Sequence, residues 1–149
     1  VTLPSTVKII GMRAFANCPF LRDINFGKGL ETIEDWAFGG CVSLTGLSFP
    51  PSIEEIRESA FVNCRNLLGV EFQNDQTTYL EPTVFRGCIA LVTISIPSSM
   101  EWVPEDTFLG CDSLTGNEED ADNDASTVRE RLTDRFENHP IHKACYHSS

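Results

Sequence analysis

The cysteines and histidines are the side chains of this chain best suited to chemistry, and their positions limit what that chemistry could be. Thiolates serve as nucleophiles, metal ligands and disulfide partners, while histidines serve as acid–base catalysts and metal ligands. The three histidines lie together near the C-terminus, at His139, His142 and His147, whereas most cysteines lie far upstream. No orienting group or oxyanion site accompanies a Cys–His pair, and no pair of acids stands out. We therefore predict no catalytic residues and no enzymatic activity.

Five of the six cysteines follow a fixed spacing. Each lies three residues after a phenylalanine and three residues before a leucine. The phenylalanines recur at intervals of 23, 23, 24 and 23 residues, and a period of about 20–50 residues indicates a stacked array of coils. We number the coils 1 to 5 by their phenylalanine and cysteine, which are Phe15 and Cys18, Phe38 and Cys41, Phe61 and Cys64, Phe85 and Cys88, and Phe108 and Cys111.

Within each coil the pattern predicts short elements. Apolar residues alternate with polar ones after each leucine, as in residues 44–49, which predicts a short strand with one buried face. The Ala-Phe-x-x-Cys stretch clusters apolar residues three to four apart, which predicts one tight helical turn. The residue before each cysteine is always Gly or Asn, the types that tolerate a left-handed backbone. Each coil should therefore run through a strand, a bend, a short extended piece and a helical turn. Coil 4 has one inserted residue within Gln73 to Tyr79, with Thr77 at a normally apolar position.

This pattern resembles the BspA-like class of leucine-rich repeats, whose consensus runs approximately Ile-x-x-x-Ala-Phe-x-x-Cys-x-x-Leu-x-x-Ile-x-Ile-Pro. The resemblance covers residues 3 to 116 in five copies. It implies a β-rich, curved solenoid in which the strands form one parallel sheet and short helical turns complete the coils. It also implies a binding or scaffolding role without a cofactor, because the family has no catalytic residues to carry over.

The repeat position of the cysteines predicts reduced, buried thiols. Each stands between a phenylalanine and a leucine that face the core, where a small thiol fills the gap between coils. Parallel side-chain directions in neighbouring coils oppose good disulfide geometry. Reduced thiols favour an intracellular compartment without fixing one.

The charge of the chain limits its partners. Eleven basic residues stand against 22 acidic ones, a formal net charge of −11. Nucleic acids and anionic membranes attract cationic surfaces, so neither is expected as the main partner. The sequence also has no apolar run of membrane-spanning length. A protein partner is the remaining expectation.

The outward face of the predicted strands is the candidate binding surface. Its residues are small and polar, so a partner could approach the backbone closely. The outward residues are Asp23 and Asn25, Gly46 and Ser48, Gly69 and Glu71, and Thr93 and Ser95. We expect Asp23, Asn25, Ser48, Glu71, Thr93 and Ser95 to make contacts in a protein-interaction or scaffolding module. The alternative is a structural spacer, or an adhesin-type segment of a larger cell-surface protein.

The repeat array should end at residue 116, because the next two apolar strand positions hold Asn117 and Glu119. Residues 117–125 are acidic and polar, which predicts a solvated linker. Its alternating aspartates resemble the start of a calcium loop. However, Ala125 stands in place of the required glycine and Arg131 in place of the bidentate acid. No calcium site is expected.

Residues 126–149 are predicted to form a helical tail. Ser126 or Thr127 can cap a helix. The stretch from His139 to Cys145 is similar to the ankyrin-repeat opening Thr-Pro-Leu-His-x-Ala, with Pro140, His142 and Ala144 matching. The similarity implies that this tail begins an ankyrin-like domain. The histidines and Cys145 match no closed zinc module, so no metal is expected.

Overall fold

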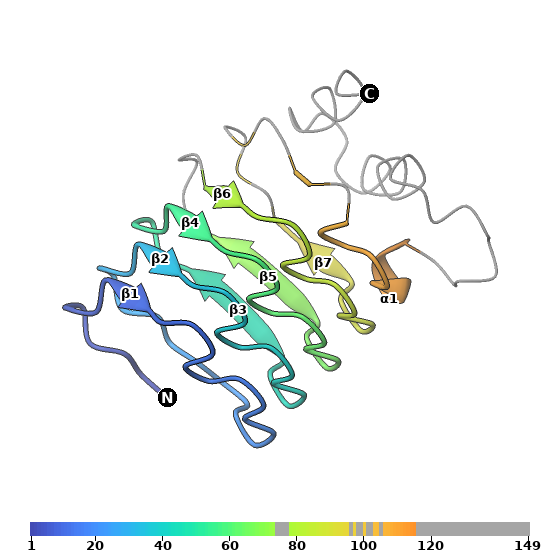
Figure 1. Ribbon diagram of the computed structural model, residues 1–149, viewed down its shortest axis with the longest axis horizontal. Coiled ribbons are helices and arrows are strands. Elements are labelled where there is room, and N and C mark those ends of the chain that lie inside the picture. Colours follow the sequence, from blue (N-terminus) through green and yellow to red (C-terminus); the bar gives the residue numbers. More distant parts are fainter. Residues whose placement is uncertain (74–77, 96, 98–99, 101–102, 105, 116–149) are drawn as a thin grey trace.

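A computed structural model describes residues 1–73, 78–95, 97, 100, 103–104 and 106–115 of the 149-residue chain. The described coils stack side by side from the N-terminus to the fifth coil (Figure 1). This arrangement confirms the prediction of a parallel β solenoid. The predicted linker 117–125, the helical tail 126–149 and Thr77 lie outside the described residues.

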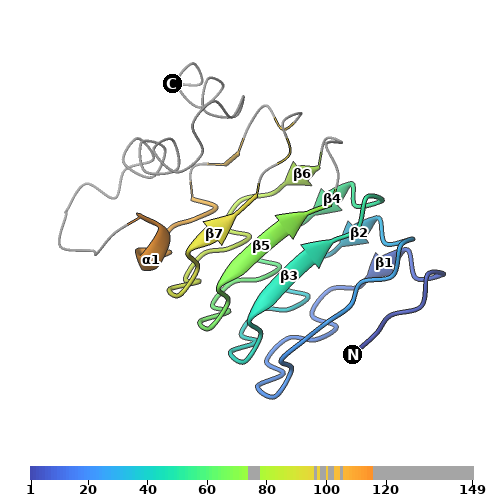
Figure 2. The same cartoon turned by 180° about the vertical axis from the view of Figure 1, so that it is seen from behind.

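One parallel sheet is formed by the strands that follow the repeat leucines. It has the order β3 (Gly46–Phe49), β5 (Gly69–Phe72) and β7 (Thr93–Ile94). The register places Gly46 beside Gly69 and Gly69 beside Thr93. In Figure 2 these three strands lie side by side across the molecule. The equivalent segment of coil 1 forms a single parallel bridge, between Asn25 and Thr2.

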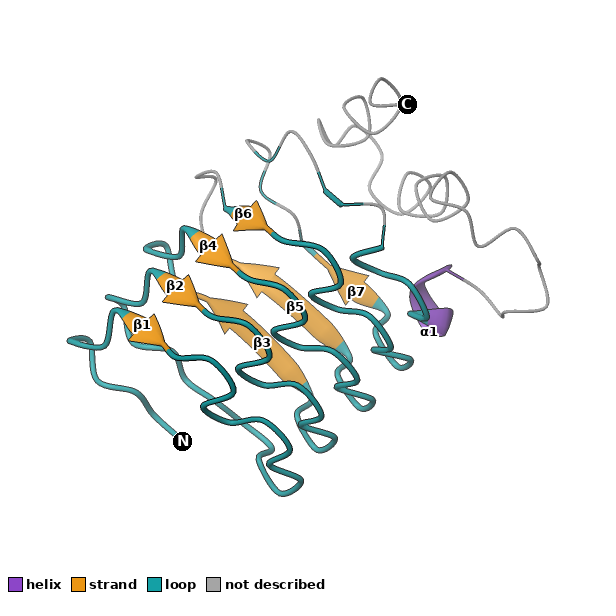
Figure 3. Ribbon diagram, viewed as in Figure 1, coloured by secondary structure: helices purple, strands orange, loops and turns teal. Residues whose placement is uncertain are grey.

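A second parallel sheet comes from the short extended pieces, which the sequence analysis did not predict to pair. Its four strands are β1 (Ile9–Ile10), β2 (Thr32–Ile33), β4 (Glu55–Ile56) and β6 (Tyr79–Leu80). Figure 3 shows this sheet on the opposite side of the coils from β3, β5 and β7. Each strand is two residues long, and in each an exposed or half-buried residue precedes a buried one. The chain then turns.

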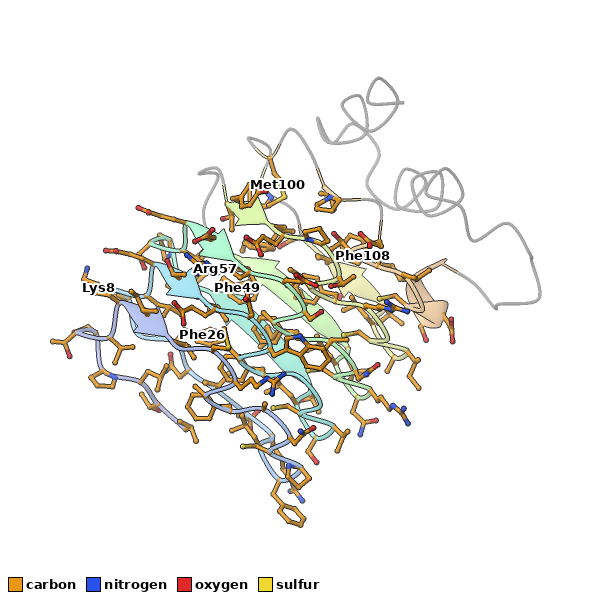
Figure 4. All side chains as sticks on the ribbon, in the orientation of Figure 1. Lys8, Phe26, Phe49, Arg57, Met100 and Phe108 are labelled. Carbon is orange, nitrogen blue, oxygen red and sulfur yellow. The ribbon has the colours of Figure 1, made fainter. Side chains whose placement is uncertain are left out.

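The core between the two sheets is built from stacked phenylalanines. The repeat phenylalanines form one stack, with ring centroids 5.0 Å apart between Phe15 and Phe38 and 5.1 Å apart between Phe38 and Phe61. A second stack contains Phe26 and Phe49, whose centroids are 5.5 Å apart; both are labelled in Figure 4. Stacked aromatic pairs contribute about 0.5–1.5 kcal/mol beyond the burial of their area. The regular stacking of the rings joins successive coils into one core.

The cysteine thiols link each coil to the one before it. Cys41 Sγ donates a hydrogen bond to the carbonyl oxygen of Phe15 at 3.0 Å, and Cys64 Sγ donates to Phe38 O at 3.3 Å. Cys88 and Cys111 donate in the same way to the phenylalanine of the preceding coil. The predicted filling of the gap between coils therefore includes a hydrogen bond from each of these thiols.

The Ala-Phe-x-x-Cys stretches form successive turns, and the expected helical turn is not a continuous helix. The residue before each cysteine has a positive φ, as predicted from its Gly or Asn identity; Asn17 is at 55° and Gly40 at 74°. A second left-handed residue lies four positions earlier in coils 1 to 4 and interrupts the helical path. These residues are Arg13, Trp36, Ser59 and Thr83, with φ between 55° and 63°. Within the described residues, the helix is α1 (Asp112–Thr115), which follows Cys111.

The insertion in coil 4 is absorbed between the two sheets. The offset between coils 3 and 2 is 23 residues where Phe72 pairs with Phe49, but it is 24 residues where Tyr79 pairs with Glu55. The extra residue thus lies between these two pairs, as predicted. Thr78 is buried beside it and donates its hydroxyl to Ile53 O at 3.3 Å.

The outer face of the four-stranded sheet carries exposed ion pairs. Lys8 Nζ lies 2.8 Å from Glu31 Oε1, and Arg57 Nε lies 3.1 Å from Glu55 Oε2. The labels of Lys8 and Arg57 in Figure 4 mark this surface. Exposed pairs of this kind contribute about 0–1 kcal/mol each. In the described part of the chain, no helix is long and apolar enough to cross a membrane.

Candidate binding face on the three-stranded sheet

The outer side of β3, β5 and β7 presents the residues that the strand pattern predicted to point outward. The alternation is strict in β3, where exposed Gly46 and Ser48 alternate with buried Leu47 and Phe49. We call this surface the strand face. It comprises Asp23, Asn25, Gly46, Ser48, Gly69, Glu71, Thr93 and Ser95, of which Gly69 is half-buried and the others are exposed.

A shallow hollow of about 430 Å³ lies on the strand face. Gly46 and Gly69 stand side by side in register, so no side chain fills the space above the backbone there. A Cβ added at Gly46 would meet nothing within 4 Å, whereas one at Gly69 would lie 3.0 Å from Thr93 Oγ1. The hollow therefore opens over β3 and narrows towards β7.

The candidate residues divide into two groups around this hollow. Ser48, Glu71 and Thr93 line it. Asp23, Asn25 and Ser95 are exposed on the same face but are not part of the lining.

Two of the outward hydroxyl groups are already hydrogen-bonded. Gln73 Nε2 donates to Ser48 Oγ at 2.8 Å, and the backbone N–H of Phe72 donates to Ser95 Oγ at 3.3 Å. Both contacts cross between neighbouring strands, and both hold a hydroxyl in a defined position. The strand face is thus preorganised at these two points, which lowers the ordering cost of binding.

The charge on the strand face is negative. Asp23 and Glu71 are its charged residues, and none of its eight residues is basic. Glu71 is in the middle strand and lines the hollow. A basic or hydrogen-bond-donating group of a partner would therefore meet favourable electrostatics here.

Sequence reasoning missed two apolar residues at the edge of the strand face. Leu68, just before β5, is 52% exposed, and Val92, just before β7, is 39% exposed. The backbone N–H of Val92 donates to Leu68 O at 3.0 Å, so the two residues are neighbours across the sheet. Each directly follows a buried repeat leucine, Leu67 or Leu91, and the repeat pattern carries no apolar residue at this next position that would have drawn attention to it.

The described residues offer no metal centre on this face or elsewhere. No group of three or more His, Cys, Asp or Glu among them could hold a metal ion. The cysteines at the repeat positions are free thiols, and burial raises the pKa of Cys41 to about 11. A thiol with a raised pKa is a poor nucleophile and a poor ligand at neutral pH. His139, His142 and His147, for which no metal was expected, lie outside the described residues.

Comparison with solved structures shows the same solenoid in bacterial proteins. The leucine-rich repeat protein of T. pallidum is 32% identical, with a TM-score of 0.68 over 77% of this chain and 53% of that chain. A leucine-rich cell surface protein of Faecalibacterium prausnitzii is 29% identical, with a TM-score of 0.70 over 76% of this chain and 30% of that chain. This chain therefore spans about half of the first relative and less than a third of the second.

The family comparison agrees with the repeat pattern. No curated protein matches the chain. The family model described as the BspA type leucine rich repeat region matches residues 1–115 in six copies. Residues 1–3 occupy the place that a strand of an earlier coil would have. Thr2 forms a parallel bridge with Asn25 of coil 1. With the period, the paired sheets and this match together, the chain belongs to the BspA-type leucine-rich repeat family.

Proposed function

We propose that the chain is a non-catalytic protein-interaction module that binds its partner on the strand face. The observation that carries the proposal is the hollow over Gly46 and Gly69, which is flanked by Ser48, Glu71 and Thr93. Concave sites with a few well-placed polar groups are the usual places where proteins hold a ligand or a side chain. Asp23, Asn25 and Ser95 extend the contact surface on both sides of the hollow.

The chemistry of the hollow favours a protruding basic side chain of the partner. Glu71 supplies a carboxylate at the rim, and the hydroxyls of Ser48 and Thr93 supply hydrogen-bond acceptors. The absence of side chains at the two glycines leaves room for a lysine or arginine stem. Leu68, exposed nearby, would cover the apolar part of that stem.

A peptide display selection tests this proposal. Random peptides are selected against the wild-type chain and then assayed on Gly46→Trp, which fills the hollow without a backbone clash because a Cβ there meets nothing within 4 Å. Gly11→Trp is the matched control, since its Cβ would meet only Glu34 Oε2 at 3.8 Å, on the side of the other sheet. We expect selected peptides to be rich in basic residues, to lose binding to Gly46→Trp and to keep binding to Gly11→Trp.

Two results would contradict the strand face as the binding site. One is equal binding of the selected peptides to both tryptophan variants. The other is binding that survives Gly46→Trp but is lost when an exposed residue outside the strand face is changed. Glu71→Gln separates charge from shape, because it keeps the size of the side chain but removes the attraction for a basic peptide.

A second candidate function is an adhesin-type segment or spacer of a larger surface protein. The F. prausnitzii relative is named as a cell surface protein, which favours this candidate. The two functions differ in what the strand face does, because a spacer needs no bound partner. A strand face that selects no peptide, in a chain that nevertheless folds, would favour the spacer.

We also propose that residues 117–125 link the solenoid to a separate helical tail at residues 126–149. The end of the family match at residue 115 supports this division, as does the acidic composition of the linker. The similarity of His139 to Cys145 to an ankyrin opening belongs to the same proposal. Amide exchange of the chain alone and of the chain extended at its C-terminus tests it, because an ankyrin-like helix should gain protection only when its neighbouring helices are present.

A further inference from the structure

A second hollow, separate from the strand face, lies over the turns that follow β2, β4 and β6. Its volume is about 410 Å³, and its lining comes from three successive coils. Trp36 belongs to coil 2, Glu58, Val62 and Asn63 belong to coil 3, and Arg86 belongs to coil 4. Neighbouring coils are about 4.8 Å apart, so the hollow spans about 10 Å from the first coil to the third. We call it the turn groove.

Trp36 forms an aromatic platform at one end of the turn groove. The indole is 41% exposed although tryptophan side chains are usually well buried. A Cβ added to Gly39 would come within 2.8 Å of Trp36 Cε3, so the six-membered ring occupies the space that a side chain at this position would need. The equivalent position holds Ala16, Val62 or Arg86 in the adjacent coils. Gly39 therefore leaves the space that the indole occupies beside the turn.

The backbone of Trp36 also fixes the platform. Trp36 has a φ of 58°, a conformation that is uncommon for a bulky residue. Its N–H donates to Glu58 O in the next coil at 3.1 Å. Arg13, Ser59 and Thr83 have the same left-handed conformation in their coils, so Trp36 shares a backbone geometry that the repeat imposes. The indole therefore lies against the turn at Gly39 while the residue stays 41% exposed to solvent.

Three planar polar side chains also line the turn groove and have no partner within the described residues. Glu58, Asn63 and Arg86 are exposed, and none has a side-chain hydrogen bond or ion pair there. By contrast, the two hydroxyls of the groove satisfy each other: Ser59 Oγ lies 2.7 Å from Thr83 Oγ1, which donates to Pro82 O at 2.6 Å. A carboxylate, an amide and a guanidinium can each make two parallel hydrogen bonds with one ligand.

Most backbone amides of the turn groove already donate hydrogen bonds within the described part of the chain. The turn amides donate from coil to coil, as Ser59 N does to Pro82 O, Phe38 N to Ala60 O and Asn63 N to Arg86 O. A bound peptide therefore finds no strand edge with which to pair. The groove offers instead one aromatic face and a set of side chains able to pair with neighbouring hydroxyl groups. Glu58 and Arg86 carry opposite charges, so the groove is close to neutral in a chain of net charge −11.

We propose that the turn groove is a saccharide-binding site that accepts one or two pyranose rings. A pyranose has an apolar face of C–H groups, which stacks on an aromatic ring, and an edge of adjacent hydroxyls, which bind planar side chains in pairs. Trp36 takes the apolar face, and Glu58, Asn63 and Arg86 take the hydroxyls. The length of the groove matches that of a disaccharide. This site is independent of the strand face and of the proposed protein partner.

Nuclear magnetic resonance of the whole chain tests the site with defined sugars. The probes are cellobiose, maltose, lactose and diacetylchitobiose, with a glucuronate-containing disaccharide as the acidic arm. The chain has two tryptophans, and the indole N–H signal of Trp36 is assigned by its loss in Trp36→Ser. Serine is a safe replacement because Ser59 occupies the same left-handed position in coil 3 with a φ of 55°. We expect at least one disaccharide to shift the Trp36 signal in a saturable way at millimolar concentrations.

Matched variants decide whether the shift reports the proposed contacts. Asn63→Gly removes the amide and keeps the left-handed backbone, since Gly40 and Gly87 stand at the equivalent positions. We expect Asn63→Gly and Arg86→Ala each to weaken the binding that the Trp36 signal reports by about tenfold or more. Trp36→Ser lacks this signal, so its binding is followed by the shifts of backbone amides and should be weakened to a similar extent. Phe20→Ala, which changes an 89% exposed aromatic elsewhere, and Gly46→Trp on the strand face should leave binding unchanged.

Three results would overturn the proposal. The first is that none of the five sugars shifts the indole signal. The second is a shift that persists with equal affinity in Asn63→Gly and Arg86→Ala. The third is a shift caused by a tetra-arginine peptide but by no sugar, which would assign Trp36 and Glu58 to a basic protein segment through cation–π and charge contacts. Preference for the acidic disaccharide, lost in Arg86→Ala, would place the sugar carboxylate at Arg86.

Discussion

Coils 1 and 3 share the repeat alanine, phenylalanine, asparagine, cysteine and leucine at the same spacing, but their interiors are buried to different extents. In coil 3, Phe61 and Cys64 are completely buried, and the Phe61 ring lies 5.1 Å from Phe38 and 5.8 Å from Phe85. In coil 1, Phe15 and Cys18 are only partly buried. Phe15 stacks on one repeat phenylalanine, Phe38. The interior of a coil is therefore completed by its neighbours, as nearest-neighbour descriptions of repeat arrays require.

The largest expected effect is the difference in the free energy of unfolding lost when Phe61 in coil 3 or Phe15 in coil 1 is truncated. Phe61→Ala should lower the free energy of unfolding by about 3–5 kcal/mol, the range for truncating a buried aromatic. Phe15→Ala should cost clearly less, because its ring is partly exposed and loses fewer contacts. Urea denaturation of both variants and of the wild type, followed by far-ultraviolet circular dichroism, measures the difference.

The same experiment contains its own control. Phe20→Ala removes an aromatic ring that is 89% exposed, so it should change the unfolding midpoint very little. Equal losses at Phe15 and Phe61 would mean that coil 1 is supported as fully as coil 3. The comparison between the two coils would then fail.

Thiol reactivity should separate the coils in the same order. Iodoacetamide should label Cys18 faster than Cys64 in the folded chain, because Cys64 is fully buried and its Sγ donates to Phe38 O. Cys88 should also be slow, since the neighbouring thiols of Cys111 and Cys64, together with burial, raise its pKa well above the usual value. Only the thiolate is nucleophilic. Peptide mass spectrometry after timed labelling reads each site separately.

The labelling experiment has a clear opposing outcome. Rapid labelling of Cys64 under native conditions would show that the coils open independently of global unfolding. In urea, all repeat cysteines should be labelled at similar rates, because the difference between coils 1 and 3 exists only in the folded array.

The sequence could predict the interior of the coils because the same few contacts recur in each coil. The prediction that the repeat phenylalanines and cysteines form the core is confirmed in coils 2 to 4. The predicted alternation of exposed and buried residues is confirmed at residues 46–49. The left-handed turn before each cysteine was predictable because only Gly and Asn occur there. The second left-handed position was not, because Arg13, Trp36, Ser59 and Thr83 share no residue type. Hydrogen bonds between coils, such as that of Arg13 N with Asp35 O at 3.0 Å, accompany this conformation.

The strand face could be predicted from the sequence in part, whereas the turn groove could be found only in the structure. The direction of the strand-face side chains followed from alternation, but the hollow arises because Gly46 and Gly69 fall in register on adjacent strands. The turn groove was not predictable, because Trp36 lies at a repeat position where Arg13, Ser59 and Thr83 share no residue type. The exposure of Trp36 depends on the space left by Gly39, three residues further along the chain.

Alkaline pH should have a smaller effect on the free energy of unfolding. It arises at Cys41 in coil 2, which has neighbouring coils on both sides. Burial raises the pKa of Cys41 from 9.0 to about 11. Below pH 9.0 the thiol is protonated in both the folded and unfolded states, so its contribution to stability is complete. As the pH rises towards 11, the unfolded state loses its proton first, and stability falls.

Comparison with Cys41→Ala isolates this effect from other groups that titrate at high pH. The difference in the free energy of unfolding between wild type and Cys41→Ala should shrink as the pH rises from 9.0 to 11. Urea denaturation at several pH values measures it. A constant difference over this range would show that the Cys41 thiolate forms as readily in the folded chain as in the unfolded one.

The smallest effect on the free energy of unfolding should come from a buried hydroxyl group in coil 5, at a position that is apolar in coils 2 to 4. Thr107 is fully buried, and its hydroxyl has no hydrogen-bond partner within the described part of the chain. The equivalent residue is Ala37 in coil 2, Ala60 in coil 3 and Val84 in coil 4, all apolar and fully buried. A buried hydroxyl without a partner costs about 1–3 kcal/mol. Thr107→Val, which keeps the shape of the side chain, should therefore raise the free energy of unfolding by about 1 kcal/mol. Val84→Thr, the reverse change one coil away, should lower it by a similar amount, and a loss of stability in Thr107→Val would show that the hydroxyl is satisfied in solution.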